Sequence, residues 1–143
     1  MSEDNGSNGL RKRREEIVRE HIDAENRHDV EGILATFHYP RYDVAPLGEP
    51  NDGADAVRDL ITGLIIGFPD FNFQPHVIHH ADKAVIVEGR MTGTQLGHWA
   101  GIPPMGGRMD VRVLCIFEFD ADQLMCEKVY FDFGTVMRQL GAI

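Results

Sequence analysis

Basic residues are scarce in this chain of 143 residues. Lysine and arginine together number 14, against 23 aspartates and glutamates, which gives a net charge of −9 with neutral histidines. A protein that binds the phosphate backbone of nucleic acids needs a cationic face. The one basic run, Arg11 to Arg14, is followed by Glu15 and Glu16 and is interpreted as a solvated helix turn. We therefore expect no nucleic-acid partner.

Long apolar runs and cysteines are scarce as well. No stretch of the sequence reaches the roughly 20 apolar residues of a membrane span, and the polar start Met1 to Asn5 does not resemble a signal peptide. The two cysteines, Cys115 and Cys126, lie in apolar, strand-like sequence. We therefore expect buried free thiols, no membrane partner and a cytoplasmic location.

The chain divides into a short tail and one domain. Residues 1–9 are rich in Gly, Ser and Asn and predict a disordered tail, whereas residues 10–143 predict a single domain. Asp29 is a candidate cap for the second helix. The apolar periodicity predicts helices at 10–28, 30–37, 54–66 and 134–140, a weak edge strand at 42–47, and longer strands at 71–80, 83–94, 108–120 and 123–133.

This order of elements predicts an α+β fold. A curved antiparallel sheet carries the N-terminal helices across its open side, which leaves a cone-shaped pocket for a hydrophobic small molecule. Both faces of the strands are apolar, so each face needs a cover. The helices cover one face, and we expect a second copy of the chain to cover the other in a homodimer.

Residues 93–108 form an unusual segment between two predicted strands. The segment contains five glycines, two consecutive prolines, the single tryptophan, Trp99, and a histidine, His98. Glycine and proline at this density predict a loop. We expect the loop to fold over the pocket, with Trp99 at the entrance and Gln95 and His98 as polar groups near the substrate.

Asp132 is a candidate for a catalytic carboxylate. A two-residue turn at 121–122 would pair residues whose numbers sum to 243, with Asp132 opposite Val111 and Tyr130 opposite Val113. All four side chains would then line the pocket, where burial raises the pKa of a carboxyl group toward the range useful for proton transfer. A slip of one residue would turn Asp132 outward. An aspartate at the end of a strand can also cap the following helix, so both roles stay open.

Three histidines near the first hairpin turn do not predict a metal site. His76 and His80 share a strand face but lie about 13 Å apart, at about 3.3 Å per residue. His79 points to the opposite face, so one ion cannot bind all three. We predict no metal, and His76 is a candidate to line the pocket.

Two motifs resemble one family. The loop contains Gly-Thr-Gln-Leu-Gly and ends in Gly-Ile-Pro-Pro-Met-Gly-Gly-Arg, and Asp132 precedes a segment ending in Arg-Gln-Leu-Gly. Over residues 12–142 the chain resembles the SnoaL-like polyketide cyclases. The resemblance implies the cone-shaped fold shared with nuclear transport factor two, ketosteroid isomerase and limonene epoxide hydrolase. It also implies that an aspartate matching Asp132 is the general acid/base of an intramolecular aldol ring closure, with no cofactor.

The chain departs from the family pattern at two places. It has Glu127-Lys128-Val129 where Glu-His-Trp is frequent, and Gln95 where a histidine is frequent. His98 is the candidate replacement for the lost imidazole. The alternatives are a non-catalytic binding or assembly domain, or a ketosteroid isomerase or epoxide hydrolase type of activity. The predicted catalytic residues are Asp132 and His98, and the predicted substrate-binding residues are Tyr130, Gln95, Trp99, Val111, Val113 and His76.

Overall fold

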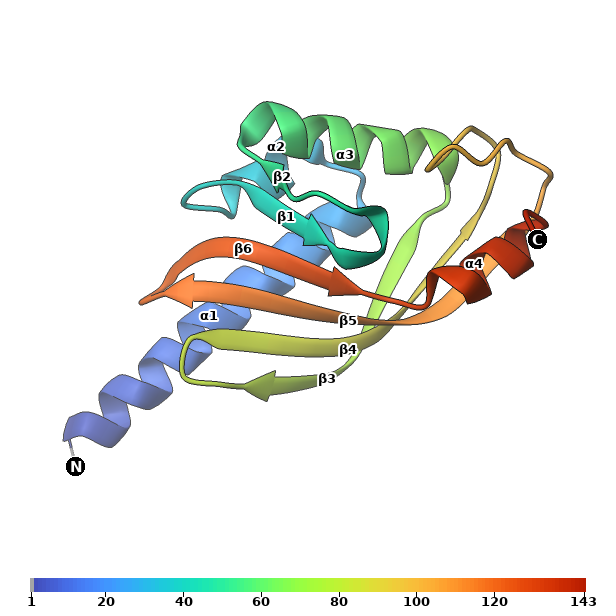
Figure 1. Ribbon diagram of the computed structural model, residues 1–143. Coiled ribbons are helices and arrows are strands. Elements are labelled where there is room, and N and C mark those ends of the chain that lie inside the picture. Colours follow the sequence, from blue (N-terminus) through green and yellow to red (C-terminus); the bar gives the residue numbers. More distant parts are fainter. Residues whose placement is uncertain (1) are drawn as a thin grey trace.

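A six-stranded sheet in the order β2-β1-β6-β5-β4-β3 is the centre of the fold (Figure 1). The computed structural model describes residues 2–143, with side chains from Gly6 onward. Along the chain the elements are α1 (Ser2–Asn26), α2 (Val30–Ala35), β1 (Arg41–Val44), a 3-10 turn (Ala45–Leu47), β2 (Asn51–Asp52), α3 (Ala54–Gly67), β3 (Asn72–His80), β4 (Ala84–Thr94), β5 (Arg108–Asp120), β6 (Gln123–Tyr130) and α4 (Phe133–Leu140).

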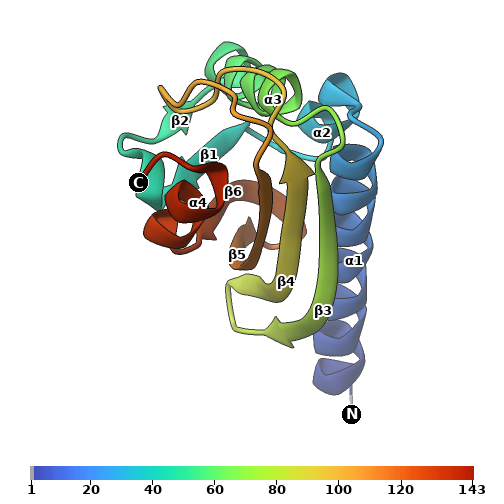
Figure 2. The same cartoon turned by 90° about the vertical axis from the view of Figure 1, so that its right-hand side faces the viewer.

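The helices are distributed over both sides of the curved sheet. In Figure 2, α1 runs along one side next to β3, α2 and α3 lie across the upper end, and α4 lies on the opposite side. The predicted α+β class is confirmed, with one correction. β1 pairs with β6 in parallel, so the sheet is mixed rather than antiparallel. A parallel pair needs a long connection, and most of the chain separates these two strands.

The first helix is longer than the sequence predicts. α1 begins at Ser2, so residues 2–9 extend the helix rather than forming the disordered segment expected there. Adding a residue to an existing helix costs less than nucleating one, which offsets the poor propensities of Gly6 and Gly9. Met1 lies outside the described residues. The predicted cap of the second helix is confirmed, because the Asp29 carboxylate accepts a hydrogen bond from the Gly32 amide.

A β-bulge in β6 changes the predicted register of the last hairpin. Asp120 pairs with Gln123 and Phe119 with Leu124, as expected, but Glu118 then pairs with Cys126. Met125 is therefore left without a partner. Because the side chains of a strand alternate, one extra residue sends every later side chain to the other face. From this point on, Glu127, Val129 and Phe131 face the helices, where the predicted register placed Lys128, Tyr130 and Asp132.

Arg14 is not the solvated residue that the sequence predicts. Its side chain is 4% exposed. Its Nε donates a hydrogen bond to the carbonyl of Ala121 and its Nη1 to the carbonyl of Asp82, and its guanidinium lies over the ring of Phe119. The two carbonyls belong to the turns of the two long hairpins. The two hydrogen bonds of Arg14 therefore link both hairpin turns to α1.

Within residues 2–143, none of the helices has both the length and the apolar character that crossing a bilayer requires.

Removing the Arg14 side chain should destabilise the protein. We expect Arg14→Ala to lower the free energy of unfolding by about 2 kcal/mol, because it removes two charge-assisted hydrogen bonds and a ring contact. Arg13→Ala is the control, since Arg13 is exposed and, among the described side chains, makes an ion pair with Glu16 alone, a loss of about 0.5 kcal/mol or less. Urea unfolding measures both values. Equal losses in the two variants would contradict the role assigned to Arg14.

Candidate functional site

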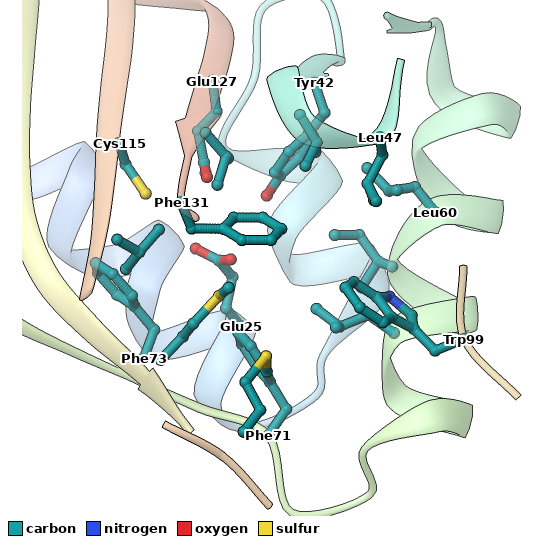
Figure 3. A pocket seen from close by; sticks show the side chains of 17 residues that line it. Glu25, Tyr42, Leu47, Leu60, Phe71, Phe73, Trp99, Cys115, Glu127 and Phe131 are labelled. Carbon is teal, nitrogen blue, oxygen red and sulfur yellow. The ribbon is translucent and has the colours of Figure 1, made fainter. Parts of the chain in front are cut away.

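An apolar cavity of about 70 Å³ lies between the inner face of the sheet, α1 and α3. Its walls include Leu60 of α3, Phe71 just before β3, Phe73 within β3, and Trp99 of the loop between β4 and β5. Carboxylate and phenol oxygens enter from Glu25, Tyr42 and Glu127, whose side chains come from three different elements (Figure 3). The cavity therefore joins an apolar wall to a small group of polar side chains.

The polar side chains gather around a fully buried imidazole, that of His21. Its Nε2 lies 2.7 Å from the hydroxyl oxygen of Tyr42, 2.7 Å from Oε1 of Glu127 and 3.2 Å from Oε1 of Glu25. Its Nδ1 lies 2.7 Å from Oγ1 of Thr36. The contact with Glu127 is a close ion pair without the alignment of a hydrogen bond, so Oε1 of Glu127 has no aligned donor among the described side chains.

Local structure explains how these residues meet. His21 and Glu25 are four residues apart on α1 and therefore share one face of the helix. Tyr42 on β1 pairs directly with Glu127 on β6 in the parallel register, so their side chains lie side by side. Glu127 faces the helices only because the bulge at Met125 precedes it. The edges of Phe37 and Phe117 pack against the imidazole and close it off from solvent.

Burial and mutual repulsion shift the pKa values of this group. Burial alone disfavours the charged imidazole, but the charges of Glu25 and Glu127 outweigh burial and raise the pKa of His21 to about 10. Burial, together with the charge of Glu127, raises the pKa of Glu25 to about 7. Burial also raises the pKa of the Tyr42 phenol well above its ordinary value. Glu25 therefore exchanges a proton near neutral pH, while Tyr42 keeps its own.

One donor atom from each of His21, Glu25 and Glu127 lies within 4.8 Å of the other two, a spacing that a metal ion could bridge. The 2.7 Å contacts of the imidazole with Tyr42 and Glu127 are, however, ordinary hydrogen-bond and ion-pair lengths. We therefore interpret the group as an ion pair with a neighbouring carboxyl. Two of the three histidines weighed for a metal in the sequence have other partners, since His79 contacts Glu88 and His80 contacts Glu15.

Two of the predicted substrate-binding residues line the cavity. These are Trp99 and Val113. Val111 is buried on the same face of β5 as Val113. Gln95 is fully buried, but its amide donates to the carbonyls of Gly97 and Ile102, so it organises the loop rather than facing a ligand.

The other predicted residues lie away from the cavity. His98, the second predicted catalytic residue, is exposed. His76 and Tyr130 are exposed and line a separate surface groove on the outer face of the sheet. The placement of Tyr130 and His76 in the pocket is wrong, because bulges at Met125 and near Pro75 change both registers.

The placement of Asp132 in the cavity is also wrong. Asp132 is exposed and occupies the N-cap position of α4, and its carboxylate accepts a hydrogen bond from the Thr135 hydroxyl at 2.5 Å. That hydrogen bond is the main reason that the pKa of Asp132 lies below its ordinary value. Asp132 thus lies at the cap position that the sequence left open as an alternative, but its carboxylate bonds the Thr135 side chain and makes no cap hydrogen bond to a helix amide.

Sequence reasoning missed His21, Glu25, Tyr42 and Glu127 as a site. One signal was present, since a histidine and a glutamate four residues apart follow the apolar positions Ile17 and Val18 of the first helix, with Ile22 between them. Polar residues on a buried helix face need partners, which is a reason to examine them. The inward orientation of Glu127 had no comparable signal, because it depends on the bulge.

Comparison with known proteins first defines the class of fold. A candidate polyketide cyclase from Xanthomonas campestris pv. campestris superposes with a TM-score of 0.82 at 18% identity, covering 92% of this chain and 98% of that one. A candidate SnoaL-like polyketide cyclase from Jannaschia sp. CCS1 gives 0.79 at 21% identity, covering 92% and 94%. A Catenulispora acidiphila protein with a ketosteroid isomerase-like fold, solved in complex with trimethylamine, gives 0.76 at 14% identity, covering 88% and 92%. The fold is that of nuclear transport factor two and ketosteroid isomerase.

The family follows from the sequence itself. The SnoaL-like domain matches residues 18–127, most of the chain, so the protein belongs to the SnoaL-like domain family. This agrees with the resemblance noted in the loop and at the end of the chain. None of the curated proteins matches the sequence.

The stability of the fold should depend on the proton of Glu25. The pKa of this carboxyl is about 7 in the folded protein and 4.5 in the unfolded chain, so the folded state binds the proton more tightly. The stabilisation is complete below about pH 4.5 and is lost as the pH rises through about 7. Because glutamine stays neutral, Glu25→Gln should gain stability relative to the natural protein across this window.

Thermal unfolding at a series of pH values measures the difference in melting temperature between the two proteins. Glu16→Gln, on the exposed side of α1, is the matched control and should give a difference that does not vary with pH. A constant difference for Glu25→Gln as well would contradict the raised pKa.

Proposed function

We propose that this protein is an acid/base enzyme that acts on a small, hydrophobic carbonyl compound, with Glu25 as the proton-transferring group. The observation that carries the proposal is the position of Glu25, whose side chain is 12% exposed and lines an apolar cavity beside a second carboxylate. A general base works best when its pKa is close to the working pH, and the pKa of Glu25 is about 7.

The proposed reaction needs only proton transfer. The Glu25 carboxylate removes a proton from the carbon next to a carbonyl, and the electron pair of that C–H bond forms an enolate. The enolate carbon attacks a second carbonyl carbon of the same molecule, which closes a ring, and the protonated Glu25 returns its proton to the new alkoxide. In a β,γ-unsaturated ketone the same deprotonation gives a dienolate, and protonated Glu25 returns its proton to the γ-carbon, so the C=C double bond moves into conjugation with the carbonyl. This isomerisation uses the same residues.

Tyr42 and the apolar walls supply the remaining functions. The Tyr42 hydroxyl stays protonated and lies on the cavity wall, where it can donate a hydrogen bond to the enolate oxygen. Phe71, Phe73 and Trp99 exclude water and bind the apolar part of the substrate. The space of about 70 Å³ favours a compact substrate over an extended polycyclic one unless side chains move.

The candidate cyclases among the structural neighbours are consistent with a polyketide-type substrate for this chain as well. A second candidate function is a non-catalytic receptor for a small molecule. The neighbour in complex with trimethylamine supports it, because that protein binds a small molecule in a chain of the same fold. The two functions differ in one measurable property, which is proton exchange with the ligand.

Replacement of Glu25 should abolish proton transfer. We expect the protein to accelerate deuterium exchange at the α-carbons of cyclohexanone or β-tetralone in D₂O, followed by proton NMR. Glu25→Gln should lower the protein-dependent rate by a factor of about 100 or more. In the natural protein the rate should rise with pH through about 7, as the carboxylate forms.

Asp132→Asn is the matched control, because it removes a carboxylate outside the cavity and should leave the rate unchanged. The catalytic role predicted for Asp132 stays a prediction that this variant tests, and a loss confined to Asp132→Asn would overturn the assignment to Glu25. Ketone binding without any exchange would instead favour the receptor.

We also propose that the protein is a homodimer that uses the outer face of the sheet. Val77 and Tyr130 are 45% and 42% exposed on this face, next to the half-buried Leu114. A second copy would remove these apolar side chains from water. Light scattering should give twice the 16.1 kDa mass of the chain, and Tyr130→Glu should shift the protein to monomer. A monomer mass for the natural protein at all concentrations would contradict the proposal.

A further inference from the structure

The proton positions around His21 can be worked out from its neighbours. The hydroxyl of Thr36 donates its single proton to the carbonyl of Ile33 at 2.7 Å. Toward His21 the same oxygen can therefore only accept a hydrogen bond. Since Nδ1 of His21 lies 2.7 Å from this oxygen, Nδ1 must carry a proton.

The other ring nitrogen faces oxygen atoms only. Nε2 lies 2.7 Å from the Tyr42 hydroxyl oxygen, 2.7 Å from Oε1 of Glu127 and 3.2 Å from Oε1 of Glu25. An unprotonated Nε2 could accept a hydrogen bond from the Tyr42 phenol, but it would still direct its lone pair at a carboxylate oxygen 2.7 Å away, which is repulsive. A protonated Nε2 attracts both carboxylates, and the Tyr42 oxygen can accept its hydrogen bond. The geometry therefore favours protons on both nitrogens.

The groups packed against His21 come from every neighbouring element. Besides Glu25 on its own helix, the titratable ones are Tyr42 on β1 and Glu127 on β6, with Cys115 on β5 next to Glu127. Burial raises the pKa of Cys115 and of Tyr42, so both are neutral near pH 7. The edges of Phe37 and Phe117 complete the enclosure.

We propose that His21 is a permanently charged imidazolium held in place by Thr36. Its positive charge keeps Glu127 as an anion. Of the two carboxyl groups, Glu25 is then the one that exchanges protons with a ligand. His21 and Thr36 are then positioning residues. The inference deepens the proposed function and rests on it for the role of Glu25.

This arrangement explains why two neighbouring carboxyl groups behave differently. Glu127 is 2% exposed and its Oε1 makes the closer contact with the imidazolium. The side chain of Glu25 is more exposed, at 12%, and its contact is longer. A fixed charge on Glu127 disfavours ionisation of Glu25, which keeps the proton of Glu25 available near neutral pH.

The charge state of His21 can be measured directly. The protein is labelled with ¹⁵N-histidine, and the ring nitrogen shifts are followed from about pH 6 to about pH 9, the range in which ordinary histidines lose their charge. His21 is assigned by the signal that disappears in His21→Gln. We expect both nitrogens of His21 to keep imidazolium shifts over this range.

Two substitutions of Thr36 test how the charge is held. Thr36→Val keeps the shape but removes the acceptor for Nδ1, so the His21 signal should begin to titrate within the measured range. The pH at which the deuterium-exchange rate is half-maximal should then move, because the charge near Glu25 changes. Thr36→Ser retains the hydroxyl and should match the natural protein in both measurements.

Titration of His21 near its ordinary pKa in the natural protein would overturn the inference, even if Thr36→Val does not fold. A change in the His21 ring ¹⁵N chemical shifts on adding EDTA or Zn²⁺ would also overturn the inference, since it would indicate a metal bound at Nε2. Identical titration of Thr36→Val and the natural protein would remove Thr36 from the proposal. Because the NMR measurement does not depend on turnover, a failure of the proposed function, with no ketone exchange, is distinguishable from a neutral His21.

Discussion

The ion pair between His21 and Glu127 is the interaction on which the site depends. Both side chains are almost entirely buried, so neither charge can be solvated by water. Burying one of them alone would cost several kcal/mol, whereas the pair, with Thr36 and Tyr42 around it, satisfies most of its hydrogen-bonding groups. Three separate elements must be docked before the pair can form, which links the integrity of the fold to the chemistry of the cavity.

The bulge at Met125 is what allows this pair to form. Without the extra residue, Lys128 would face α1 in place of Glu127, and a buried lysine next to His21 would have repelled it. The bulge also brings Val129 and Phe131 to the cavity wall. A single unpaired residue in one strand therefore decides both the charge and the shape of the pocket.

The sequence predicted the fold more accurately than the site. Periodicity placed the main helices and the four long strands, and the cap at Asp29 was read correctly, because these features depend on local patterns. The motifs of the loop and of the C-terminal segment identified the family. The site was missed because the orientation of Asp132 and Glu127 depends on a bulge, and no sequence pattern within β6 predicts that bulge. Arg14 was missed because its partners, the turns at Asp82 and Ala121, are remote in the sequence.

The loop between β4 and β5 approaches α3 very closely. A methyl group on Gly67 would lie 2.8 Å from Cβ of Trp99, and one on Gly97 would lie 2.5 Å from the carbonyl oxygen of Ile66. This loop and α3 supply one part of the apolar wall of the cavity, through Trp99, Leu60 and Leu64, and none of its charged groups, which come from α1 and β6. Substitutions in the loop and in α3 can therefore change which ligand fits the cavity without altering the carboxyl groups proposed to transfer the proton.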